Sequence, residues 1–185
     1  LDDASASDLV FIASGKWANR WEASSAKVAL VTRGVEVPGH DASERTLIMV
    51  DDAEIGIMLL LEAVAAELRP APGPGIHPTA SVHDDAVLGD DVHIGASAVV
   101  EAHARIGDGV VLHAGAVVGH NARVGEHAVI GINAVLGASC ELGDRSILHP
   151  SAVVGADGFG FRPDPETGLP RRIPHLGTVE IGNDV

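Results

Sequence analysis

Residues 92–113 read VHIGASAVVEAHARIGDGVVLH and contain the pattern that decides the fold. An isoleucine, leucine or valine returns at every sixth residue, and a glycine often follows it. The pattern runs without a gap over fourteen positions, namely Ile76, Val82, Leu88, Ile94, Val100, Ile106, Leu112, Val118, Val124, Ile130, Leu136, Leu142, Leu148 and Val154. A period of six residues is the signature of a parallel β-helix, in which each repeat adds one short strand to a stack.

The rest of the repeat supports a narrow prism. Two residues before each aliphatic position lies a small or slim side chain, usually alanine, with Cys140 and Ser146 as variants. Three repeats make one triangular coil, so residues about 18 apart are expected to stack at about 4.8 Å. The glycine that follows is expected to supply a turn with unusual backbone angles. Such a prism has no room for aromatic rings, and residues 22–158 contain no Phe, Trp or Tyr.

Charge and composition exclude several classes of protein. Twelve Lys and Arg against 26 Asp and Glu give a net charge of −14, which argues against binding nucleic acid or an anionic membrane surface. The single cysteine excludes a disulfide framework and a cysteine-based zinc site. The longest apolar run, residues 55–61, is far too short to span a membrane, so we expect no transmembrane segment.

Residues 1–69 have the pattern of a small α/β domain. Asp51 or Asp52 is expected to cap its second helix, and Arg69 before Pro70 to end it. We predict strands over residues 9–12, 28–31 and 47–50, helices over 16–26 and 53–68, a linker over 70–75 and the β-helix over 76–185. Because the chain starts at Leu1 in an acidic turn-like segment and stops at Val185 within the repeat, we expect both domains to be incomplete at the outer end.

Ten histidines raise the question of a metal site. His77, His113 and His149 share one face, but they are 36 residues apart in turn, which is two coils or about 10 Å. Zinc requires ligands within about 2.1 Å of one ion, so no metal is expected. His113, His120 and His149 are candidates for a general base, against the alternative of solvated turn residues.

The repeat breaks at an excursion over residues 156–178. It begins Ala-Asp-Gly-Phe-Gly-Phe, where Phe159 and Phe161 alternate with glycines on a scaffold that otherwise excludes aromatic rings. A loop that departs from a rigid scaffold often carries function. The two rings are expected to form a ligand wall, or alternatively to pack beneath their own loop.

The repeat resembles the left-handed β-helix of the hexapeptide-repeat acyltransferases. The segment from Val154 to Phe161, the return through residues 173–182 and the amino-terminal residues 1–17 resemble one family among them, the UDP-3-O-(3-hydroxyacyl)glucosamine N-acyltransferases of lipid A synthesis. The resemblance implies a cytoplasmic homotrimer, or one peripheral to the inner membrane. It also implies transfer of a 3-hydroxyacyl chain from acyl carrier protein to the 2-amine of UDP-3-O-acyl-glucosamine, with no cofactor.

The resemblance also implies where substrates bind. The uracil would stack between Phe11 and Trp17, with Ser14 at its edge; Trp17 replaces the family's usual tyrosine, and Ser14 its usual asparagine. Asp157, Gly158, Phe159, Gly160 and Phe161 would also contact substrate. The alternative for the aromatic pair is that Phe11 is a core strand residue and Trp17 packs a helix.

The family's catalytic histidine would lie beyond Val185, so this chain is expected to lack it. Arg162, Arg171 and Arg172 could contribute a basic patch for the acidic carrier protein. Two further functions remain open: another hexapeptide-repeat acetyl- or acyltransferase using coenzyme A or acyl carrier protein, and a zinc-binding β-helix of the carbonic-anhydrase type.

Overall fold

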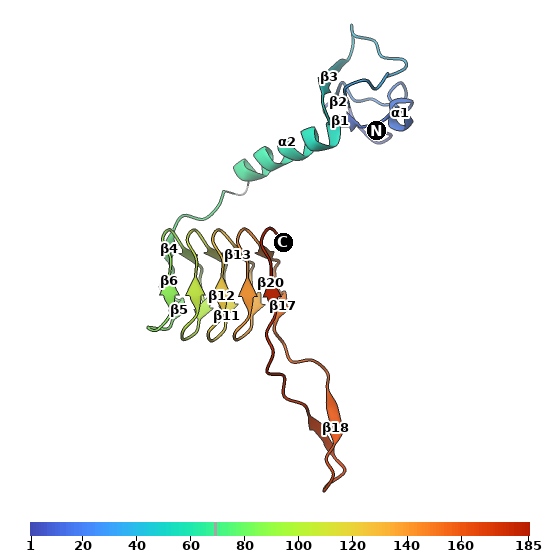
Figure 1. Ribbon diagram of the computed structural model, residues 1–185. Coiled ribbons are helices and arrows are strands. Elements are labelled where there is room, and N and C mark those ends of the chain that lie inside the picture. Colours follow the sequence, from blue (N-terminus) through green and yellow to red (C-terminus); the bar gives the residue numbers. More distant parts are fainter. Residues whose placement is uncertain (69) are drawn as a thin grey trace. The chain divides into compact units, whose positions relative to one another are not determined.

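The chain divides into two compact units, Leu1–Ala71 and Pro72–Val185. The structure is a computed structural model that describes residues 1–68 and 70–185. Figure 1 shows the elements of each unit.

The first unit is built on a three-stranded parallel sheet in the order β1-β2-β3. Its strands are β1 (Leu9–Ile12), β2 (Val28–Thr32) and β3 (Thr46–Val50), which confirms the three predicted strands. One face of the sheet carries the core, where Ile12, Val31 and Trp21 are fully buried. Trp21 is therefore the aromatic residue that fills this small core.

The first helix is much shorter than predicted. α1 spans Gly15–Ala18, so the predicted helix over residues 16–26 is wrong beyond Ala18. The chain continues in tight turns, with the amide of Trp21 donating to the oxygen of Ala18. The Arg45 guanidinium donates to the oxygens of Trp21 (2.7 Å) and Ser24 (3.2 Å), which a continuing helix would use for its own hydrogen bonds.

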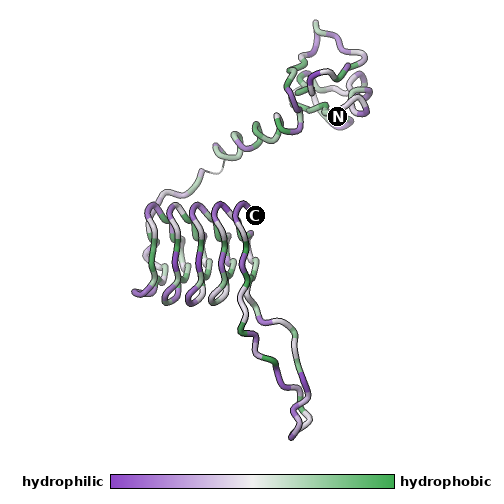
Figure 2. Tube along the Cα trace, viewed as in Figure 1, coloured by the Kyte–Doolittle hydropathy of each residue, from purple (hydrophilic) through white to green (hydrophobic). Residues whose placement is uncertain are grey.

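The second helix has the predicted bounds. α2 spans Ala53–Leu68, and Asp52 Oδ1 caps it by accepting the amides of Glu54 and Ile55 at 2.8 and 3.1 Å. Arg69, the expected last residue, lies outside the described residues. Apolar residues run along α2 (Figure 2), yet Ala53 is the one buried residue of the helix as described.

The second unit consists of three five-stranded parallel sheets, here called the first, second and third faces. The first face contains β4 (Gly75–Ile76), β7 (His93–Ile94), β10 (Val111–Leu112), β13 (Val129–Ile130) and β16 (Ile147–Leu148). The second contains β5 (Ser81–Val82), β8 (Val99–Val100), β11 (Val117–Val118), β14 (Val135–Leu136) and β17 (Val153–Val154). The third contains β6 (Val87–Leu88), β9 (Arg105–Ile106), β12 (Arg123–Val124), β15 (Glu141–Leu142) and β20 (Glu180–Ile181).

The register confirms the predicted stack. Leu112 pairs with Ile94 on one side and with Ile130 on the other, and all three side chains are fully buried. The aliphatic residue of each repeat points inward with the small residue before it, so the prism is filled by one continuous apolar core. The parallel strands, repeated coil after coil, fit the predicted left-handed β-helix.

The glycine that follows the aliphatic residue has a different role from the one predicted. Most positive φ angles occur two residues later, as at Asn121 (58°) and Asn133 (55°), and not at Gly107 or Gly119; Gly155, where the repeat breaks, does have the predicted positive φ (84°). A Cβ on Gly107 would instead lie 2.8 Å from the backbone nitrogen of Glu126 in the next coil. Glycine is therefore needed here because consecutive coils approach closely, and the unusual backbone angles fall on Asn, Asp, His, Ser, Arg or Gly.

The excursion is an insertion that leaves the stack intact. On the third face Leu142 pairs with Ile181, 39 residues further on, whereas other inward residues pair 18 apart. The interruption contains an antiparallel hairpin of β18 (Phe161–Pro163) and β19 (Pro170–Arg172), where only a loop was predicted (Figure 1).

Asp164 holds the turn of this hairpin. Its Oδ1 accepts the amides of Glu166 and Thr167, both at 3.0 Å, and its Oδ2 lies 3.4 Å from Arg171. The hydrogen bonds from the amides of Thr167 and Glu166 lower the pKa of Asp164 below its ordinary value, because they stabilise the charged carboxylate.

Among the helices described, none is long and apolar enough to cross a membrane.

Candidate functional site

Phe11 and Trp17 line one hollow in the first unit. Its volume is about 420 Å³, and Leu1, Leu9, Val10 and Glu54 complete its described lining. The rings are 43 % and 42 % exposed, so neither is a core residue, a role that Trp21 fills. The structure therefore brings together the two aromatic residues for which base stacking was predicted.

The local fold explains why both rings reach this hollow. Successive side chains of a strand point to opposite faces, so Phe11 lies on the face opposite Ile12, which is in the core. α1 begins three residues after β1 and presents Trp17 in its single turn. Ser14 lies between them as the N-cap residue, and its backbone oxygen accepts the amide of Trp17 at 3.0 Å. Its side chain is not among the described groups that line the hollow.

Two cations contact Trp17. Lys16 Nζ lies 5.4 Å and the guanidinium carbon of Arg20 lies 5.0 Å from the centre of the ring. Arg20 also forms an ion pair of 2.7 Å with Asp2. These cations were not predicted from the sequence, although the spacing from Trp17 to Arg20, almost one helical turn, is a signal for such a contact.

A second hollow lies at the base of the excursion. It has a volume of about 360 Å³, and Asp157, Gly158, His175 and Thr178 contribute to its lining. Asp157 forms an ion pair of 2.5 Å with Arg172. A Cβ on Gly158 would lie 3.1 Å from His175 Nε2, so glycine allows the imidazole to approach the backbone. His175 was not predicted as a site residue; its place in the segment that returns after β19, opposite the glycines, is visible only in the fold.

The other predicted residues of the excursion are not part of the described lining of this hollow. Phe159 is 97 % exposed, and its ring centre lies 5.2 Å from that of Phe161. A Cβ on Gly160 would lie 3.5 Å from His175 Cε1. Of the five residues predicted here, the described lining of the hollow includes Asp157 and Gly158 alone.

The histidines of the prism are dispersed. His113 and His149 follow the first face in different coils, whereas His120 follows the second. The rings of His103 and His120 meet edge to face at 5.3 Å, a contact that the sequence analysis did not foresee. Within residues 1–68 and 70–185, no group of three or more His, Cys, Asp or Glu is placed to hold a metal ion.

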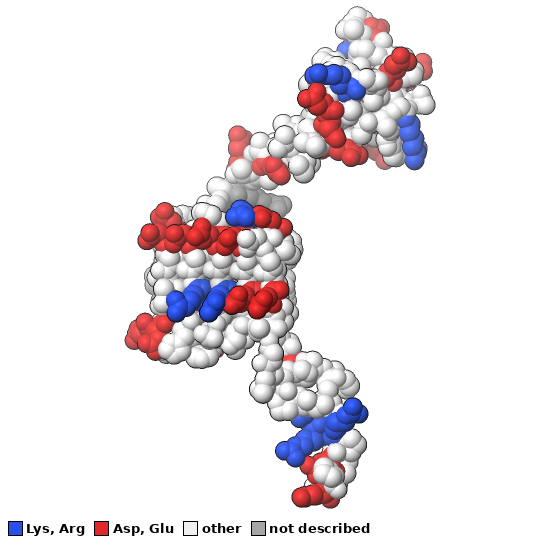
Figure 3. All heavy atoms as spheres, viewed as in Figure 1, with Lys and Arg blue, Asp and Glu red and all other residues white. Residues whose placement is uncertain are grey.

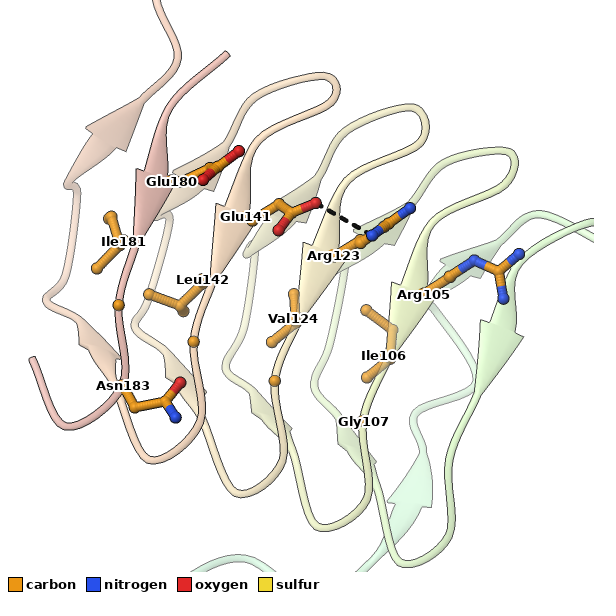
Figure 4. A pocket seen from close by; sticks show the side chains of 13 residues that line it. Arg105, Ile106, Gly107, Arg123, Val124, Glu141, Leu142, Glu180, Ile181 and Asn183 are labelled. Atoms are coloured by element: carbon orange, nitrogen blue, oxygen red, sulfur yellow. Dashed lines mark ion pairs between the residues drawn. The ribbon is translucent and has the colours of Figure 1, made fainter.

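The third face carries a row of charges over a further hollow of about 660 Å³ (Figure 4). The row runs Arg105, Arg123, Glu141, Glu180 across adjacent strands, with the ion pair Arg123–Glu141 at 3.3 Å. Figure 4 shows these side chains pointing outward, while Ile106, Val124 and Leu142 point into the prism. Glycines form the floor beside the row, and we assign no substrate to this face.

Comparison with known proteins relates the whole chain to one group of enzymes. The chain is 51 % identical over 185 residues to a UDP-3-O-acylglucosamine N-acyltransferase from Nitrosococcus oceani, covering all of this chain and 52 % of the relative. The protein of the same name from Leptothrix cholodnii is 42 % identical over 186 residues, covering all of this chain and 53 % of the relative. The chain therefore spans about half the length of the curated relatives it matches.

Two other comparisons are less specific. The family model of the GMPPB C-terminal domain matches residues 73–156, which lie within the repeats. An Arabidopsis UDP-N-acetylglucosamine acyltransferase aligns with a TM-score of 0.31 at 25 % identity, covering 46 % of this chain and 32 % of that chain. A mutant of perosamine N-acetyltransferase from Caulobacter crescentus aligns with a TM-score of 0.42 at 17 % identity, covering 96 % of this chain and 90 % of that chain. At these TM-scores the structural likenesses carry no conclusion.

The sequence relationship over the whole of this chain agrees with the resemblance seen in its motifs, and it extends over both units. By its sequence, the chain is a homologue of the UDP-3-O-acylglucosamine N-acyltransferases, similar to them over its whole length.

Proposed function

We propose that the protein is an N-acyltransferase that moves a 3-hydroxyacyl chain from acyl carrier protein to the 2-amine of UDP-3-O-acyl-glucosamine in lipid A synthesis. The observation that carries this proposal is the 51 % identity over the whole chain to a relative named for this acceptor. We also propose that the protein works in the bacterial cytoplasm, or at the inner membrane as a peripheral protein.

The chemistry requires an amine to attack a thioester directly. A base removes the proton from the attacking nitrogen, the amide bond forms, and the carrier thiolate leaves and takes up a proton, so no covalent enzyme intermediate is needed. Imidazole suits the base at neutral pH. The backbone amide of His120 donates to Glu101 Oε2 at 2.7 Å. We assign the role of base to none of His113, His120 and His149, since among the described residues none of their imidazole rings is ion-paired with a carboxylate and none of them lines the hollow of Phe11 or that of Asp157.

The hollow of Phe11 and Trp17 supports a role in binding the uracil ring. A flat base stacks on aromatic faces, and each such stack contributes about 1–3 kcal/mol. The exposure of both rings leaves them accessible to a ligand. The excursion hollow of Asp157, Gly158 and His175 is a second region for substrate contact, next to the last coil of the stack.

Stacking is tested by measuring UDP-N-acetylglucosamine binding calorimetrically to the chain and to its Phe11→Ala and Trp17→Ala variants. We expect each variant to lose about five-fold or more in affinity, because each removes one aromatic face. Ile48→Ala, which removes another exposed apolar side chain of the same sheet, is the control and should leave binding unchanged. An affinity for UDP-N-acetylglucosamine that is unchanged by both aromatic substitutions would contradict the proposed site.

A homotrimer is supported by the outward side chains of the prism. The first face presents Val111, Val129 and Ile147, and the second presents valines along β8, β11, β14 and β17. The third face instead presents the charged row (Figure 3). Two apolar faces and one charged face suit a ring of three copies, in which the first face of each packs on the second face of the next.

The hairpin supports docking of an acidic carrier protein. Arg162 and Arg171 lie directly opposite each other in the hairpin, and Arg172 follows Arg171 in β19. Arg171 and Arg172 are paired with Asp164 and Asp157, whereas no ion pair of Arg162 is found in the part of the chain described. Of these three arginines, Arg162 is therefore the one most available to an acidic partner.

The activity is tested with the whole protein of which this sequence is part. Transfer of a 3-hydroxyacyl chain from its carrier protein to UDP-3-O-acyl-glucosamine, followed by mass spectrometry, would support the assignment. Transfer from acetyl coenzyme A alone would favour the second candidate enzyme. Stoichiometric zinc in the purified protein would favour the carbonic-anhydrase-type alternative.

A further inference from the structure

The aromatic hollow depends on a contact that lies outside it. Arg20 and Lys16 both contact the Trp17 ring, yet the described residues that line the hollow include neither cation. Arg20 is therefore placed to act on Trp17 without touching a ligand that the hollow contains. This separates it from Phe11 and Trp17, which face the hollow themselves.

Arg20 is held in position by three contacts. Its guanidinium forms the 2.7 Å ion pair with Asp2, and it lies 5.0 Å from the centre of the Trp17 ring. Its amide donates to the oxygen of Trp17 at 3.0 Å. Lys16 has only the contact with the ring, at 5.4 Å, and no ion pair among the described residues. A planar guanidinium also stacks on an aromatic face better than an ammonium does.

The Asp2–Arg20 pair also joins two walls of the hollow. Leu1 lines the hollow beside Trp17, and Asp2 is its immediate neighbour in the chain. The oxygen of Leu1 accepts the hydroxyl of Ser24 at 2.9 Å, so this segment is tied to the core side of the unit as well. The pair therefore connects the wall that Leu1 provides to the wall that Trp17 provides.

We propose that Arg20 is a positioning residue for the base-binding hollow: anchored by Asp2, its guanidinium fixes the Trp17 ring in the orientation that accepts a flat base. This inference rests on the proposed binding of a uridine nucleotide. It assigns Arg20 an effect on the base and not on the phosphates, which is what the experiment separates.

The test compares two ligands with the same base, uridine and UDP, by calorimetric titration of the full 185-residue chain and its Arg20→Ala variant. If Arg20 positions Trp17, both ligands should lose affinity by the same factor. That factor should be roughly two- to five-fold, because losing an exposed cation–π contact weakens binding by about this much. If Arg20 instead binds phosphate, UDP alone should weaken and uridine should be unaffected, which would overturn the proposal.

Three variants sharpen the comparison. Asp2→Asn removes the anchor but keeps Arg20, and should reproduce part of the loss for both ligands. Arg20→Lys retains the charge without the planar group, and should restore only part of the affinity. Arg33→Ala removes another exposed ion pair of the same unit, with Asp51 at 3.2 Å, and should change nothing.

A second measurement does not depend on any ligand. The chain has two tryptophans, of which Trp21 is fully buried and Trp17 is 42 % exposed, so acrylamide quenching of fluorescence reports mainly on Trp17. Arg20→Ala should increase quenching while the melting temperature stays unchanged. Unchanged quenching would contradict the positioning role. If Arg20→Ala increases quenching but Trp17→Ala leaves uridine binding intact, the result contradicts the proposed nucleotide site. It still supports the contact between Arg20 and Trp17.

Discussion

At the scale of single residues, the repeat glycines are explained by crowding between coils. Gly107 and Gly182 occupy the same place in the repeat on the third face. A Cβ on Gly107 would meet the backbone of Gly125 and Glu126, whereas a Cβ on Gly182 would have nothing within 4 Å. The requirement for glycine therefore comes from the stacked neighbour and not from the turn.

This difference predicts the effect of an added methyl group. Gly107→Ala should destabilise the chain by about 1–3 kcal/mol, because the next coil must shift to admit the new Cβ. Gly182→Ala is the matched control and should change the unfolding free energy by less than about 0.5 kcal/mol. Urea unfolding followed by circular dichroism measures both, and equal effects of the two substitutions would refute the crowding explanation.

At the scale of elements, the periodicity of the repeat predicted the strands because each strand is selected by one local feature. Each strand contains one inward aliphatic residue, such as Leu112, so the strands can be located from the sequence alone. Each coil pairs only with the coils next to it, so no long-range contact alters this pattern. The helix over residues 16–26 was mispredicted because the position of Trp21 is decided by long-range contacts. Its burial and the hydrogen bonds from Arg45 to its carbonyl both come from outside the segment.

The same reasoning explains what was predicted of the candidate site. Phe11 and Trp17 are close in sequence on adjoining elements, so their joint placement followed from a short segment. His175 reaches Gly158 only because the chain after the hairpin returns to the same place, and no local pattern encodes that return. Residues 159–161 alternate aromatic rings and glycine, but whether such rings face a hollow or solvent depends on the path of the hairpin.

The hairpin should respond to acid through Asp164. Hydrogen bonds from the amides of Thr167 and Glu166 lower the pKa of Asp164 below its ordinary value of 3.8. Because the pKa is lower in the folded state, the stabilisation is complete above the ordinary value and is lost as the pH falls through the lowered one. The hairpin should therefore be fully formed at pH 5 and loosen below about pH 4.

Amide hydrogen exchange of Thr167 and Glu166, followed by NMR as the pH is lowered, measures this change after correction for intrinsic exchange. Asp164→Ala should show low protection at every pH. Asp164→Asn retains an acceptor oxygen without a titrating group, so its protection should not depend on pH in this range. A wild-type hairpin whose protection is the same at pH 3 and pH 5 would argue against this role of Asp164.

At the scale of the whole molecule, the distribution of outward side chains predicts how copies associate. Val135 of the second face and Val129 of the first point outward, and both are half-buried in the single chain. In the proposed trimer these two faces meet, so a buried charge there would lack a partner. Val135→Asp and Val129→Asp should each convert the trimer to monomers.

Light scattering coupled to size-exclusion chromatography measures the mass of each variant. Arg123→Asp, on the charged third face, is the matched control and should remain trimeric. Circular dichroism checks that every variant keeps its strands. A trimer that survives both valine substitutions would show that these faces are not the interface.

The inserted hairpin also affects the order in which the coils form. Most coils close a loop of 18 residues onto the previous one, as in the pairing of Arg123 with Arg105, whereas β20 closes 39 residues onto β15. The longer loop costs about 0.7 kcal/mol more chain entropy for the same short strand pairing. The pairing of β20 with β15 should therefore form last during folding of this chain and be the first to open.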